Sequence, residues 1–162
     1  MKNPAVKWGL ILGGLGTAWA VVMMSTGWST DPVMANLAWV NLLFTIIVMI
    51  SAMRETAAQG KSYGGQVGTG FVVALVSGLV GAIASYILTA FVFPNFLSEV
   101  LAMQEEAMRA KGTLEEAQIQ QAMEGMAFMF TPPVNAAVGF IFSVCIGTLI
   151  ALPIAAFVRA KK

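Results

Sequence analysis

The chain has 162 residues, of which 58% are hydrophobic and only 10% are charged, and its mean hydropathy is +0.80. A soluble domain has roughly 45–50% apolar and about 25% charged residues, so the composition excludes an ordinary water-soluble domain. The formal net charge of +1 argues against nucleic acid as a partner. Histidine is absent and Cys145 is the single cysteine, so the chain lacks the usual proton shuttle and an intrachain disulfide.

The first apolar segment predicts a transmembrane helix over residues 6–28. Asn3 and Pro4 precede it and have the residue types of a helix N-cap and first turn. A cleaved signal peptide is the alternative, because Ala18 and Ala20 could frame a small-residue cleavage site. The apolar run continues past Ala20 without a polar stretch, so we expect the helix to be retained.

The second apolar segment predicts a transmembrane helix over residues 33–53. Asp31 and Pro32 repeat the order of a capping side chain followed by proline. We expect Arg54 and Glu55 to end this helix.

The third apolar segment predicts a transmembrane helix over residues 66–93. A polar, glycine-rich loop over residues 54–65 leads into it. Pro94 follows, and since proline disfavours helix in the residue before it, we expect the helix to stop or kink there.

Residues 95–131 predict an amphipathic helical hairpin outside the membrane. Six glutamates alternate there with apolar residues at three-and-four spacing, and Gly112 interrupts the pattern. Thr113 and Glu116 fit a capping box that starts the second helix. The apolar faces, expected to contact each other, a partner or the membrane surface, include Leu97, Val100, Met108, Ile119, Met123 and Met126.

The last apolar segment predicts a transmembrane helix over residues 133–158, started by Thr131 and Pro132. The basic residues near the span ends fall on one side, which the positive-inside rule makes cytoplasmic. They are Lys2, Lys7, Arg54, Lys61, Arg159, Lys161 and Lys162. The expected fold is one all-α membrane domain over residues 1–162, with four transmembrane helices, cytoplasmic termini and a periplasmic hairpin between helices three and four, in the bacterial inner membrane.

Small residues recur every fourth position along three of the predicted spans. Such stripes allow close backbone approach between helices in lipid, so they predict either packing within the bundle or an interface with another subunit. They are Gly9 and Gly13, Ala74 and Gly78, Ser77, Gly81 and Ser85, and Gly139, Ser143, Gly147 and Ala151.

Neither a catalytic residue set nor a cofactor or metal motif is recognisable, and no ionisable residue falls in the middle of a span. The leading hypothesis is therefore a non-enzymatic membrane scaffold or accessory subunit, with a membrane-protein partner or a second copy of itself. The alternative is an oligomeric channel or facilitator for a neutral or lipidic solute, with Asn36, Asn41 and Asn135 facing a shared path. A methionine copper site in the hairpin is a third possibility, because thioethers bind reduced copper.

Three stretches carry a resemblance to a known family. They are residues 62–71 (SYGGQVGTGF), then Pro94, Phe96 and Leu97, and the hairpin, whose Gly-Thr turn at residues 112–116 is followed by a methionine-rich helix, Pro132 and Pro133. Over most of its length the chain resembles an uncharacterised family of small bacterial membrane proteins, domain of unknown function 4199, common in Bacteroidota. The resemblance implies a four-helix inner-membrane protein and assigns no activity.

Overall fold

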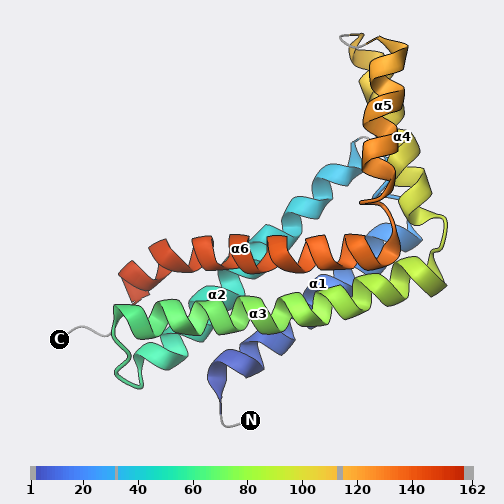
Figure 1. Cartoon of the computed structure of the whole chain (residues 1–162). Coiled ribbons are helices and arrows are strands. Elements are labelled where there is room, and N and C mark those ends of the chain that lie inside the picture. The colour runs from blue at the N-terminus through green and yellow to red at the C-terminus, as the bar shows by residue number, and fades with distance from the viewer. Residues whose placement is uncertain (1–2, 32, 113–114, 159–162) are drawn as a thin grey trace.

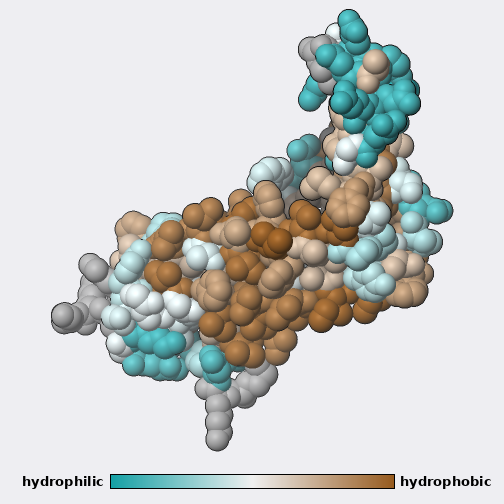
Figure 2. All heavy atoms as spheres, in the orientation of Figure 1, coloured by the Kyte–Doolittle hydropathy of each residue, from teal (hydrophilic) through white to brown (hydrophobic). Residues whose placement is uncertain are grey.

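A computed structural model describes residues 3–31, 33–112 and 115–158, and this part of the chain is helical without a β-strand. Four of its helices are long and apolar enough to cross a membrane: Pro4–Ser25, Met34–Ala57, Tyr63–Val92 and Pro132–Val158. A band of hydrophobic residues covers the visible face of these helices in Figure 2. The structure therefore indicates a multi-pass membrane protein.

The first helix, α1, covers Pro4–Ser25 and begins as the sequence predicts. The Asn3 side chain accepts a hydrogen bond of 3.0 Å from the Ala5 N–H, and proline occupies the first turn. The helix ends three residues before the predicted end at residue 28. Gly27, with φ of +72°, turns the chain out of the helix there.

The second span begins in a tighter form than expected, as the 3₁₀-helix η1 over Met34–Trp39, and continues as α2 over Val40–Ala57. One carboxylate oxygen of Asp31 accepts hydrogen bonds of 2.8 Å from the N–H groups of Met34 and Val33. These two bonds lower the pKa of the Asp31 carboxyl below its ordinary value. Pro32, expected to start the span, lies outside the described residues.

The α2 helix continues past Arg54 and Glu55, where the sequence predicts its end. The Glu55 carboxylate accepts hydrogen bonds from Lys7 Nζ at 2.6 Å and from Trp8 Nε1 at 2.7 Å, both on α1. A charged residue near the end of this span is therefore tied to a neighbouring helix, and α2 extends to Ala57.

The third span consists of α3 over Tyr63–Ile87 and a π-helical segment, η2, over Leu88–Val92. The Phe93 N–H donates to the Leu88 carbonyl at 2.7 Å, which is the i to i−5 bond of a π-turn. The span ends just before Pro94, as expected from the proline.

Two shorter helices, α4 over Phe96–Lys111 and α5 over Glu116–Ala127, connect α3 to the last long helix, α6, over Pro132–Val158. Figure 1 shows α4 and α5 side by side, extending away from one end of the long helices. Hydrophilic residues gather on their visible tip in Figure 2.

The turn between α4 and α5 differs in one detail from the prediction. Gly112 adopts the left-handed conformation that ends α4. The predicted cap Thr113 lies outside the described residues, and the capping box in the structure is formed by Glu115 and Gln118. Glu116, expected to close that box, is instead the first residue of α5 and forms an ion pair with Arg109 of α4.

The long helices are arranged around α3, which contacts α1, α2 and α6. The start of α1, the end of α6 and the α2–α3 connection lie at one end of the bundle, opposite α4 and α5 (Figure 1). The buried residues of α2 lie between Val48 and Thr56, in the second half of the span Met34–Ala57, and η1 has none. The second span therefore packs tightly on the bundle along only part of its length.

A candidate ligand cavity between the four long helices

Glycines on α1 bring this helix against α3. A Cβ built on Gly9 would lie 2.6 Å from the Cβ of Val76, and one on Gly13 would lie 2.6 Å from the Cβ of Val80. Real Cβ atoms do not approach so closely, so these two glycines are required for the observed contact. This predicted stripe is therefore used inside the chain.

The contact between α3 and α6 uses two more of the predicted stripes. A Cβ on Gly147 would lie 2.6 Å from that of Ala74, and one on Gly78 would lie 3.1 Å from the Phe140 ring. Ala151 is buried against Gly70 at the same interface. These residues pack two helices of one chain together.

Small residues of the predicted stripes also border a cavity of about 560 Å³. Besides residues of the two packing contacts, they include Ser77, Gly81 and Ser85 on α3, and Gly139 and Ser143 on α6. A Cβ built on Gly81 or on Gly139 would meet no atom within 4 Å, so both glycines face open space. At Gly81 and Gly139, the small residues therefore leave room for a ligand, whereas at other positions of the stripes they allow close contact between helices.

The first half of the second span forms another wall of this cavity. This wall includes Trp39, Asn41, Leu42 and Thr45. It lies in the part of the second span before Val48, which has no buried residues. The Trp39 side chain is 70% exposed and Phe142, on α6, is 64% exposed. Two largely exposed aromatic side chains therefore border the cavity, and its volume falls in the 300–1,000 Å³ range typical of ligand sites.

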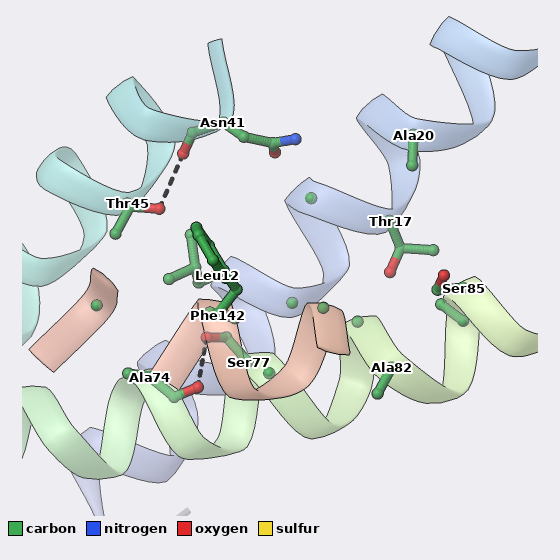
Figure 3. A pocket seen from close by; sticks show the side chains of 18 of the residues that line it. Leu12, Thr17, Ala20, Asn41, Thr45, Ala74, Ser77, Ala82, Ser85 and Phe142 are labelled. Carbon is green, nitrogen blue, oxygen red and sulfur yellow. Dashed lines mark hydrogen bonds between the residues drawn. The ribbon is translucent and has the colours of Figure 1, made fainter. Parts of the chain in front are cut away.

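The polar groups around the cavity differ in how they are paired. The hydroxyl groups of Thr45 and Ser77 donate to carbonyls of their own helices, at 2.8 and 3.1 Å. The Thr17 hydroxyl oxygen is buried and has no hydrogen-bond partner in the described residues. The side-chain amide of Asn41 extends into the space between α2 and α1 (Figure 3).

The structure separates the three asparagines that the sequence analysis placed on a shared path. Asn41 lines the cavity. Asn36 is exposed and donates to the Val33 carbonyl at 3.1 Å. Asn135 accepts a long hydrogen bond of 3.5 Å from Ser85, which itself lines the cavity. Within one chain, Asn41 is thus the asparagine placed to meet a ligand.

The cavity walls carry no formal charge, because the lining residues in the described part of the chain include no aspartate, glutamate, lysine or arginine. Transfer of an ion into such surroundings is costly without a partner charge. The geometry therefore suits an uncharged, largely apolar molecule.

The predicted hairpin residues fall into two groups by exposure. Leu97 and Ile119 are buried, whereas Val100, Met108, Met123 and Met126 are half-buried. The described residues include no group of three histidine, cysteine, aspartate or glutamate side chains placed to hold a metal ion.

Sequence reasoning missed Trp39, Thr17 and Phe142 as cavity residues. Each lies in an apolar helix where every face has similar hydropathy, so no amphipathic pattern marks the inward side. The glycine and serine spacing was the usable signal, and it indicated helix packing rather than open space.

Together these features define a multi-pass, all-helical membrane protein with a neutral cavity between its long helices. The chain belongs to the family described as protein of unknown function (DUF4199), whose family model matches residues 7–160. Searches of curated proteins and of solved structures return no match.

Proposed function

We propose that the protein binds a neutral lipidic molecule in the cavity between its long helices and facilitates its movement in the membrane. The observation that carries this proposal is an open space of about 560 Å³ bordered by small, uncharged residues. The small residues predicted to serve either helix packing or a subunit interface support it, because Gly81, Ser85, Gly139 and Ser143 border this space.

We place the protein in a bacterial inner membrane with both termini in the cytoplasm. The basic residues Lys7 and Lys61 belong to the start of α1 and to the α2–α3 connection, which lie at the same end of the bundle. The positive-inside rule assigns that end to the cytoplasm and α4 and α5 to the periplasm. Cysteine labelling in intact cells tests this orientation, which predicts reaction near Glu124 and protection near Lys61.

Lipid retention by the purified protein tests the proposed cavity. We expect mass spectrometry of the protein in mild detergent to detect an uncharged lipid bound to the wild type. Gly81→Leu places a side chain in the open space and should abolish this retention. Gly68→Leu is the matched control on the same helix, since Gly68 is exposed, also meets no atom within 4 Å and does not line the cavity.

Two results would contradict the proposal. One is a wild-type protein that retains no uncharged lipid in mild detergent or in lipid nanodiscs. The other is equal retention by the two leucine variants, which would show that the bound lipid lies elsewhere. Flux of the identified lipid between reconstituted vesicle leaflets would then separate facilitated movement from simple binding.

A membrane accessory subunit is the second candidate, and the α4–α5 pair favours it. Six glutamates lie on or beside these helices, and Phe128 and Met129, just after α5, are 69% and 46% exposed. We expect a photoreactive residue at position 128 to cross-link a membrane-protein partner or a second copy of the chain. The same residue at position 83, which is 62% exposed on α3, is the control for non-specific contact. Equal labelling at both positions would count against this role.

A further inference from the structure

The Asn41 side chain is half-buried and lines the wall of the cavity. Its backbone carbonyl accepts from Thr45, but its side chain forms no hydrogen bond with the described part of the chain. An amide offers two donor hydrogens and an acceptor oxygen, and each is costly to leave unpaired in an apolar environment.

Several threonine side chains in these helices form hydrogen bonds within their own helix. The hydroxyls of Thr45, Thr89 and Thr148 donate to the carbonyls four residues earlier, at 2.6 to 2.8 Å. A hydroxyl reaches that carbonyl by rotation about one bond. The larger amide of Asn41 carries more hydrogen-bonding groups than its own helix satisfies, and it faces the cavity (Figure 3).

Gly16 on α1 provides the space for this amide. A Cβ built on Gly16 would lie 3.4 Å from the Oδ1 atom of Asn41, which is ordinary contact distance. The absence of a side chain at Gly16 therefore leaves the neighbourhood of the amide oxygen open to a small polar group. Gly16 and Asn41 both line the cavity.

We infer that Asn41 is a specificity residue for an uncharged lipid that carries a hydroxyl group. A hydroxyl both donates and accepts, so it pairs with the amide oxygen and with an amide hydrogen. The lipid chain lies against the apolar and small residues of α3 and α6. The inference rests on the proposed lipid-binding function and adds the chemistry of the ligand.

The lack of charged side chains around the cavity favours a ligand with a hydroxyl group over one with a phosphate or a carboxylate. No basic side chain lines the cavity in the described residues, so an anionic headgroup has no partner charge there. A simple alkane, in turn, leaves the amide unpaired. An alcohol satisfies both conditions.

Binding of two matched probes tests the inference. Tritiated 1-hexadecanol and hexadecane have the same chain length and differ by one hydroxyl. We expect the wild-type protein, captured in mild detergent, to bind the alcohol about tenfold more tightly than the alkane. This ratio is the factor that corresponds to about 1.4 kcal/mol.

Asn41→Leu should remove the preference for the alcohol while leaving alkane binding unchanged. Unchanged alkane binding would show that the cavity is intact in this variant. If Asn41→Leu does not fold, Asn41→Ala replaces it in the same comparison. Asn36→Leu is the control, because Asn36 lies outside the cavity, and it should keep the preference.

The outcomes separate the inference from the function on which it rests. If wild type binds both probes equally, or if Asn41→Leu keeps the preference, the role of Asn41 is refuted and lipid binding stands. If wild type binds neither probe, the proposed function fails as well.

Discussion

The contact between α1 and α3 makes a sharp prediction about Gly13. In Gly13→Ala, the new methyl carbon would lie 2.6 Å from the Val80 Cβ and 3.3 Å from the Ser77 Cα. Carbon atoms prefer separations of about 3.5–4.0 Å, so the two helices must move apart by about 1 Å. Overpacking of this kind costs about 1–3 kcal/mol.

The neighbouring glycine provides the control for this substitution. A Cβ on Gly14 meets no atom within 4 Å, so Gly14→Ala changes the helix propensity without the clash. We expect the free energy of unfolding, measured in detergent by denaturant titration, to be about 1–3 kcal/mol lower for Gly13→Ala than for Gly14→Ala.

A second substitution tests whether the clash is the cause. Val80→Gly removes the side chain that the new methyl group would meet, so Gly13→Ala should lower the free energy of unfolding less in a Val80→Gly background than in the wild type. Equal stability of the Gly13 and Gly14 variants would refute the reasoning, because it would mean that α1 and α3 do not meet at this point.

Three further predictions concern polar groups near the ends of the spans. Glu55→Gln should lower the free energy of unfolding only slightly, and less so at high salt, since the ion pair with Lys7 is partly exposed. Gln66→Met should change the free energy of unfolding by less than about 1.5 kcal/mol in a thermal unfolding assay. It removes the buried, unpaired Nε2 group together with the bond from the Thr56 hydroxyl to Oε1, and that hydroxyl also lies within hydrogen-bond distance of the Ala52 carbonyl. An NMR titration should give Asp31 a pKa below its ordinary value. The stability that its ionised carboxylate contributes is present above the unfolded-state pKa and is lost as the pH falls through the lowered folded-state pKa. Asp31→Asn should lack this loss of stability in acid.

Capping residues and prolines in the sequence predicted most helix ends to within a few residues. Asn3 caps α1 as expected, because the Asn-Pro order is a short-range signal. The extension of α2 through Glu55 was not predictable in the same way. The residue that pairs with Glu55 is Lys7, far away in the sequence, and only the fold brings them together.

The cavity itself was not predictable from hydropathy. Protein interior and lipid are both apolar, so an α6 that is apolar on all sides gives no signal for its inward face. Four-residue spacing did identify Gly139 and Gly147 as one stripe. The structure divides this stripe, with Gly147 against Ala74 and Gly139 facing open space.

The partial packing of the second span has a mechanical consequence. Its second half is anchored by buried side chains and by the bond between Glu55 and α1, whereas its first half borders the cavity. A rod fixed at one end moves most at the other, so a small tilt about Met53 produces its largest displacement near Trp39. The Trp19 indole on α1 donates to the Leu37 carbonyl at 3.1 Å and ties that end to α1. Such a tilt would change the width of the cavity beside Trp39.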